Sequence, residues 1–184
     1  MTHRLPRTLR LDPSDAVVFS RAAAPGEWAV PGGFDFWDED PASLSGKRRQ
    51  EFRAGFLGLS SFGFSTLVEV AEASPAEREA AITALATHIR AAYGAPDEAA
   101  ARAAALEEIS FAESLCDHPP GTVLALARSI EDGQVRERFR TLHRRETPHS
   151  DFGSLPVFGI VAVEGEEEAE EVDLTQIQEK RLGE

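Results

Sequence analysis

Three residues with reactive side chains adjoin at positions 116–118. Cys116, Asp117 and His118 bring a thiol, a carboxylate and an imidazole together at the predicted end of a helix. A nucleophilic cysteine needs a base within hydrogen-bond reach, and adjacent positions at a helix end do not by themselves supply that geometry. The negative end of a helix dipole also raises a thiol pKa. We therefore favour a packing role for Cys116, with His118 beside the helix dipole, and keep catalysis as the alternative.

A second group of candidate functional residues consists of arginines. Arg136, Arg138 and Arg140 alternate along one predicted strand, so they share one face of it, and Arg144 and Arg145 follow. Guanidinium groups in such an array suit a carboxylate, a phosphate or an acidic protein segment. The alternative is a solvated face neutralised by nearby glutamates, where each surface ion pair contributes about 0–1 kcal/mol. The chain's own acidic end is a third candidate to cover these arginines.

The sequence predicts neither a metal site nor a cofactor site. Its five histidines lack the paired spacing of a zinc site, and one cysteine cannot build a thiolate cage. The acidic residues between positions 35 and 40 lack the spacing of a calcium loop. Gly55 and Gly58 are not followed by the lysine and hydroxyl residue of a phosphate-binding loop. These observations favour a non-catalytic protein, although they leave an enzyme open.

Charge divides the chain into two parts. The net charge is -13, which argues against nucleic acid as a partner, since a phosphate backbone is drawn to basic surfaces. Residues 164–184 hold nine acidic and two basic residues, a net of -7, which leaves -6 for residues 1–163. The acidic run has little to bury. We therefore predict one domain over residues 1–163 and a disordered acidic tail over residues 164–184.

Composition also indicates the compartment. Hydrophobic residues make up 42% and charged residues 28% of the 184-residue chain, which are values of a globular protein. A single cysteine, Cys116, excludes an internal disulfide and fits a reducing compartment. No stretch has the length and apolar character of a signal peptide or a membrane span. We expect a cytoplasmic protein that does not bind membranes.

Two consecutive helices are predicted in the middle of the chain. Ser74 to Glu77 has the pattern of a capping box with proline at the first helical position, and apolar residues recur at helical spacing up to Tyr93. Asp97 is the N-cap candidate of the second helix, which continues to Cys116 and ends before Pro119. We expect both helices to pack on a sheet.

The arginines belong to a predicted hairpin. Asp132-Gly133 is a dipeptide that favours a type I′ turn, so residues 122–130 and 134–142 form its two strands. With a two-residue loop, Arg128 faces Glu137 on a mostly apolar face, and Arg138 lies opposite Ala127 on the other face. The fold class predicted is therefore α+β, with a mostly antiparallel sheet.

The N-terminal part of the chain is predicted to form further strands. Ala16 to Phe19 is predicted as a strand after a turn, and Trp28 to Phe36 as an aromatic hairpin reversed at Pro31-Gly32-Gly33. The stretch Phe52 to Val70 combines phenylalanines with glycines, so we expect it to lie where these strands meet the later helices. A pocket between the Trp28–Phe36 hairpin and the 116–118 helix end would serve an enzyme or a small-molecule binder.

Five short segments carry a resemblance to a known family. They are Arg7–Asp12, Gly26–Val30, Phe52–Gly58, Ser114–Pro119 and Glu137–Leu142. Together they resemble an uncharacterised family of small proteobacterial proteins known only as a domain of unknown function, over about residues 4–145. The resemblance implies no reaction and no catalytic residue. It implies an accessory role beside a cofactor-dependent redox enzyme. We therefore expect an interaction protein that uses its arginines to hold an acidic partner or anion.

Overall fold

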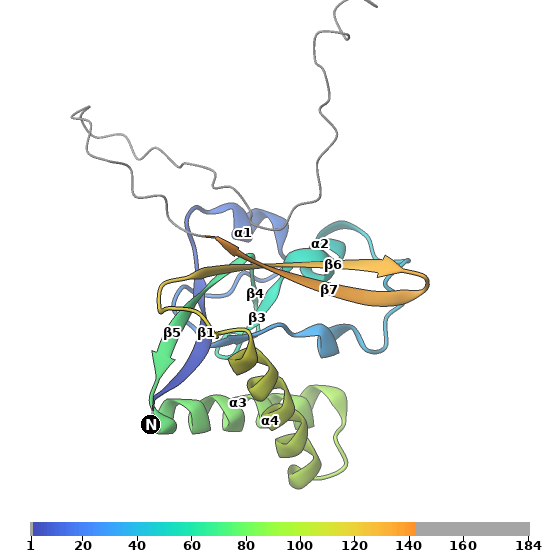
Figure 1. Cartoon of the computed structure of the whole chain (residues 1–184). Helices are drawn as coiled ribbons and strands as arrows, with labels where there is room; N and C mark the ends of the chain where they lie inside the picture. The colour runs from blue at the N-terminus through green and yellow to red at the C-terminus, as the bar shows by residue number, and fades with distance from the viewer. Residues whose placement is uncertain (1, 143–184) are drawn as a thin grey trace, which may run out of the picture.

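The computed structural model describes residues 2–142. Arg144, Arg145, the predicted acidic tail and the end of the predicted domain lie outside these residues. Within them the chain forms helices and two antiparallel sheets, which confirms the α+β class (Figure 1). The strands are β1 (His3–Leu9), β2 (Ala29–Val30), β3 (Phe56–Gly58), β4 (Phe64–Ser65), β5 (Leu67–Ala73), β6 (Val123–Glu131) and β7 (Gln134–Leu142). The helices are α1 (Ser14–Val18), the 3-10 helix η1 (Gly33–Phe36), α2 (Gly46–Ala54), α3 (Pro75–Tyr93) and α4 (Glu98–Ser114).

The larger sheet has the order β1-β5-β6-β7, and all its neighbours are antiparallel. β5 pairs with β6 only between residues 67–69 and 123–125, whereas β6 and β7 pair along their full length. The β6–β7 hairpin therefore projects beyond the rest of the sheet, as the long yellow and orange pair in Figure 1.

The turn of this hairpin has the predicted type. Asp132 and Gly133 both have positive φ, 52° and 75°, as a type I′ turn requires. The register is the predicted one, with Arg128 opposite Glu137 and Ala127 opposite Arg138. Because side chains alternate between the faces of a strand, this register decides which side chains point inward.

The smaller sheet, β2-β3-β4, separates two hydrophobic clusters. Leu57 and Val30 pack in a cluster shared with the helices α3 and α4, whereas their neighbours Phe56 and Ala29 pack against β5, β6 and Cys116. All four side chains are at most 1% exposed. A strand buried on both faces explains why the glycine- and phenylalanine-rich stretch lies at the centre of the fold.

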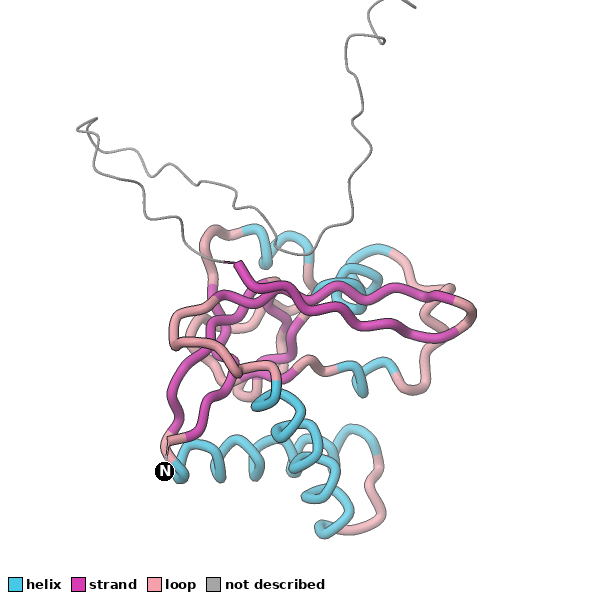
Figure 2. The backbone as a smooth tube through the Cα atoms, in the orientation of Figure 1, coloured by secondary structure: helices cyan, strands magenta, loops and turns pink. Residues whose placement is uncertain are grey.

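The helices α3 and α4 begin where the sequence predicts, and α3 also ends as predicted, whereas α4 ends at Ser114, before the predicted Cys116. Ser74 Oγ accepts a bond from the Glu77 amide at 3.2 Å, and the Glu77 carboxylate accepts one from the Ser74 amide at 2.8 Å. Asp97 caps α4 by accepting from the Ala100 amide at 2.7 Å. Gly94, with φ of 67°, ends α3 in a left-handed conformation. Both helices pack below the strands in the view of Figure 2.

The predicted hairpin from Trp28 to Phe36 is wrong. Its first arm forms β2, which pairs with β3, and its second arm forms the 3-10 helix η1. Gly32 adopts φ of 73° and turns the chain out of the sheet. Phe36 then packs edge-to-face on Phe52 of α2, with ring centroids 5.3 Å apart, and also contacts the ring of Phe64 in β4.

The strand predicted at residues 16–19 is also wrong, because this segment forms α1. The predicted turn is present just before this helix, where the Asp12 carboxylate accepts from the Ser14 amide at 2.8 Å. Asp15, only 5% exposed, accepts from the Thr66 hydroxyl at 2.6 Å and so ties α1 to the start of β5.

The capping box gives a stability prediction. Replacing Ser74 by alanine removes one acceptor and one donor at the start of α3, so we expect the free energy of unfolding to fall by about 1 kcal/mol in urea denaturation. Ser114→Ala is the control, because its exposed hydroxyl only donates to the Phe111 carbonyl, and we expect a change within about 0.5 kcal/mol. Equal losses in the two variants would contradict a capping role.

Candidate functional site

The arginine face of β7 consists of Arg136, Arg138 and Arg140. The side chains of Arg136 and Arg138 are 58% and 61% exposed, and Arg140 is exposed as well. Their cross-strand partners on β6 are two alanines and a serine, which are too short to cover guanidinium groups. In the part of the chain that the structure describes, β7 is an edge strand. Within residues 2–142, the side chains of Arg136 and Arg138 are therefore accessible beside the free edge of β7.

One glutamate meets this face at the tip of the hairpin. Glu131 Oε1 lies 2.6 Å from Arg138 Nη2, and Glu131 Oε2 lies 4.0 Å from Arg136 Nε. A hydrogen bond from Ser129, followed by the bond from Arg138, lowers the pKa of the Glu131 carboxyl. Each guanidinium has five N–H donors, so a single shared carboxylate leaves donors on both arginines for an external acceptor.

Arg128 anchors the hairpin to the rest of the molecule. Its side chain is completely buried, and Nε donates to Glu137 Oε1 at 2.7 Å. Nη1 donates to the Phe52 and Gly55 carbonyls at 3.0 and 3.3 Å, and Nη2 donates to the Pro31 carbonyl. One guanidinium thus joins β6 and β7 to the end of α2 and to the segment between β2 and η1.

Two opposing effects act on the pKa of Arg128. Burial lowers its pKa, and the hydrogen bond and charge of Glu137 oppose that shift. Gly33 lies against the pair, since a Cβ atom there would lie 3.0 Å from Glu137 Oε1. The sequence predicts the Arg128–Glu137 pairing, but not that the guanidinium would be buried among carbonyl groups.

The structure places Cys116 in the core. Cys116 is 1% exposed and packs with Phe56, Val68 and Leu124. Burial, followed by the charge of Glu113, raises the pKa of its thiol to about 12. A thiol with such a pKa is almost wholly protonated at neutral pH, which makes it a poor nucleophile.

The neighbours of Cys116 form no reactive arrangement with it. Asp117 is exposed, and the His118 carbonyl accepts a bond from Arg4 at 3.2 Å. Trp28 packs against the other hydrophobic cluster, the one that contains Val30 and the helices. Neither of the two pockets described next is lined by any of these residues.

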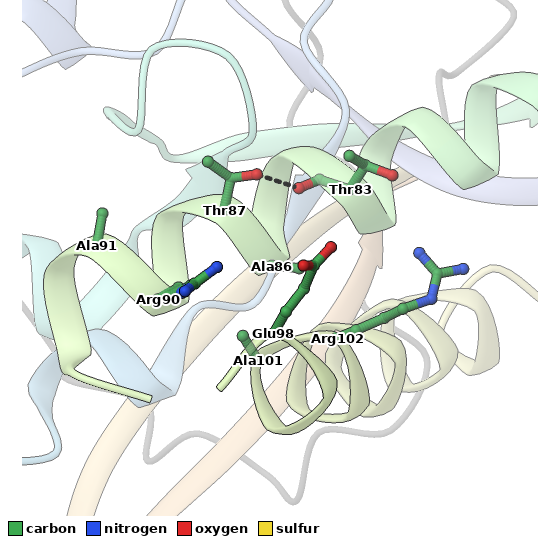
Figure 3. A pocket seen from close by; sticks show the side chains of 8 residues that line it. All are labelled: Thr83, Ala86, Thr87, Arg90, Ala91, Glu98, Ala101 and Arg102. Atoms are coloured by element: carbon green, nitrogen blue, oxygen red, sulfur yellow. Dashed lines mark hydrogen bonds between the residues drawn. The ribbon is translucent and has the colours of Figure 1, made fainter. Parts of the chain in front are cut away.

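The larger pocket has a volume of about 560 Å³ and lies between α3 and α4 (Figure 3). Thr87 donates to the Thr83 carbonyl within α3, and Glu98 projects from α4 toward α3. Arg90 and Arg102 also line the space, and Arg102 pairs with Glu79 outside it at 2.7 Å. Charges of both signs surround this pocket, so it favours no single class of ligand.

The smaller pocket, of about 260 Å³, lies where η1 meets the end of α3 and the middle of α4. It is lined by Phe34, Trp37, Ile89, Tyr93, Ala104, Glu107 and Glu108. Sequence reasoning missed this pocket because its residues come from three distant segments. The available signal was an aromatic cluster beside an acidic loop, which we interpreted as part of a hairpin.

Residues 2–142 form neither a metal-binding cluster nor a helix that could span a membrane. In residues 2–142, no group of three or more histidine, cysteine, aspartate or glutamate side chains is arranged to hold a metal ion. None of the helices in the same range combines the length and the apolar character needed to cross a membrane.

Comparison with known proteins places the chain in a family. The family model described as "Family of unknown function (DUF6505)" matches residues 1–172. The chain belongs to the DUF6505 family. Membership confirms the resemblance to an uncharacterised domain and extends it at both ends beyond residues 4–145. No curated protein and no solved structure matches the sequence of this DUF6505 member, so neither a reaction nor a site can be transferred to it.

The burial of Arg128 leads to a prediction for this DUF6505 protein. Arg128→Met leaves the Glu137 carboxylate and three carbonyl groups without their donor, so we expect the free energy of unfolding to fall by about 3–5 kcal/mol. Arg136→Met removes an equal charge from the surface and should change it by less than about 0.5 kcal/mol. Urea denaturation compares the two variants, and similar losses would show that Arg128 is not an anchor.

The burial of Cys116 leads to a second prediction. With one cysteine in the chain, a disulfide reagent such as dithionitrobenzoate reports on Cys116 alone. We expect no fast reaction of the folded protein at pH 8 and one thiol per chain in denaturant, because the folded thiol is buried and its pKa is raised. A rapid stoichiometric reaction of the folded protein would restore Cys116 as a candidate nucleophile.

Proposed function

We propose that this protein is a non-catalytic accessory protein that binds an acidic segment of a partner protein through the arginine face of β7. The observation that supports this most is the exposure of Arg136 and Arg138 on an edge strand of a projecting hairpin. Guanidinium groups recognise carboxylates with paired N–H donors, and an edge strand offers free backbone groups to an added strand. The two features act on the same partner if its acidic segment is extended.

The strand geometry specifies how such a segment would be arranged. A partner strand added to the edge of β7 would place every second side chain on the arginine face. Carboxylates at alternate positions would then lie beside Arg136, Arg138 and Arg140, while backbone hydrogen bonds fix the register. The anchor at Arg128 favours this mode, because it holds β6 and β7 in place before the partner arrives and so reduces the ordering cost of binding.

The proposed setting is the cytoplasm of a proteobacterium, with a cofactor-dependent redox enzyme as the partner. The resemblance described above supports the accessory role, and the single cysteine supports a reducing compartment. The raised pKa of Cys116 supports a protein without nucleophilic catalysis. The acidic net charge supports a protein partner rather than nucleic acid.

The test uses a fluorescent peptide in which glutamate alternates with threonine over seven residues. We expect its anisotropy to rise on addition of the full-length protein at low salt. The triple variant Arg136→Ala/Arg138→Ala/Arg140→Ala should weaken binding at least about tenfold, since three contacts worth about 0.5 kcal/mol each sum to that factor. A control peptide has glutamine in place of glutamate. The wild-type protein should bind it at least as weakly as the triple variant binds the acidic peptide.

A charge-matched control excludes a general effect of net charge. Arg49→Ala/Arg53→Ala/Arg90→Ala removes three exposed arginines from α2 and α3 and should leave the peptide affinity within about twofold. Equal weakening by both triple variants, or no binding of the acidic peptide by the wild type, would overturn the proposal. Affinity purification from the native cell with the two triple variants then identifies the partner by its selective loss.

A further inference from the structure

The smaller pocket is surrounded by negative charge. Glu107 and Glu108 line it from α4, and the last turn of α3 contributes Tyr93 together with carbonyl groups that carry the negative end of the helix dipole. Two arginines of the surrounding elements are already paired, the half-buried Arg48 with Asp35 at 2.7 Å and the buried Arg128 with Glu137. The pocket therefore presents carboxylates to a ligand, and the charge of Arg128 offsets that of Glu108 only in part.

Its walls are aromatic. The rings of Phe34 and Tyr93 meet edge-to-face with centroids 5.5 Å apart, and the Tyr93 hydroxyl donates to Asp35, which fixes this ring. Trp37 is 67% exposed, which is unusual for the largest apolar side chain. Aromatic faces carry negative quadrupole charge and attract cations within about 6 Å. The aromatic rings and the carboxylates of this pocket thus both favour a cation.

Within residues 2–142, Glu108 has no arginine or lysine in direct contact, although the charge of Arg128 acts on it from a distance. It is partly buried, yet it makes no hydrogen bond or ion pair of its own with any residue between positions 2 and 142. Burial, followed by the charge of Glu137, raises the pKa of the Glu108 carboxyl, while the charge of Arg128 opposes the shift. Desolvating an ionised carboxylate without a partner is unfavourable, and a bound cation would remove this penalty.

We propose that this aromatic and acidic pocket binds a small organic ammonium ion with an apolar body, such as an alkylamine. Its volume of about 260 Å³ is below the range of drug-sized sites and suits one short alkyl chain with its ammonium group. The apolar chain packs on Ile89 and Ala104, and the ammonium lies between the rings and Glu108. This site shares no residue with the arginine face of β7.

Nuclear magnetic resonance of the full-length protein tests the site. The chain has two tryptophans, so Trp28→Phe assigns the indole N–H signal of Trp37. We expect n-butylammonium chloride at pH 7.5 to shift this signal saturably at millimolar concentrations, and n-butanol, its neutral analogue, to shift it at least about fivefold less at equal concentration. Sodium chloride at the same ionic strength provides the baseline.

Two matched variants locate the charge that matters. Glu108→Gln should weaken butylammonium binding about fivefold or more, whereas Glu98→Gln, on the same helix but in the larger pocket, should leave it unchanged. Glu108→Gln should keep the protein folded, which a cooperative thermal transition verifies, because Glu108 makes no hydrogen bond or ion pair within residues 2–142. Equal shifts by butanol, no saturable shift, or equal weakening by both variants would overturn the proposal. If N-acetyl-lysine amide binds more tightly than butylammonium, the proposal of a small free amine is wrong, and the ligand is instead a lysine side chain of a partner protein.

Discussion

The buried guanidinium of Arg128 is the interaction on which the arrangement of the molecule depends. It satisfies carbonyl groups at the end of α2 and beside η1, and it neutralises Glu137 on the neighbouring strand. No apolar side chain could replace it, since three carbonyl groups would lose their donor in a place that water does not reach. The pairing of β5 with β6 covers three residues on each strand, so the rest of the hairpin is held to the body by side chains: Arg128, the contacts of β6 with α2, and the apolar packing of Leu126 and Phe139.

The two candidate surfaces follow from how the fold distributes charge. On the outward face of the hairpin, β7 places its arginines beside small residues of β6, and the positive groups stay in solvent. On the other side of the molecule's core, η1 and the two long helices bring aromatic rings next to glutamates. The arginine face and the acidic pocket thus lie on different elements, although the net charge of the chain is strongly negative. The first surface suits an acidic partner and the second a cation.

The sequence predicts the elements whose signals are local. The capping residues Ser74 and Asp97 and the Asp132-Gly133 turn act through their nearest neighbours, so both helices and the hairpin register are correct. Alternating apolar residues at 28–36 are compatible with a strand or a tight helix, and only the packing of Phe36 decides between them. The arginine face could be predicted because it lies on one strand. The aromatic pocket could not, since Trp37, Tyr93 and Glu108 meet only through tertiary structure.

The exposure of the arginine face has a consequence for how the protein can change over evolutionary time. Its side chains contribute little to the core, because the inward face of the hairpin carries the packing and the anchor. Substitutions at these outward positions therefore escape the purifying selection that acts on folding, and drift or adaptation can reshape the face while the scaffold persists. A lineage could exchange one binding partner for another by altering a few codons of β7, with Arg128 left untouched.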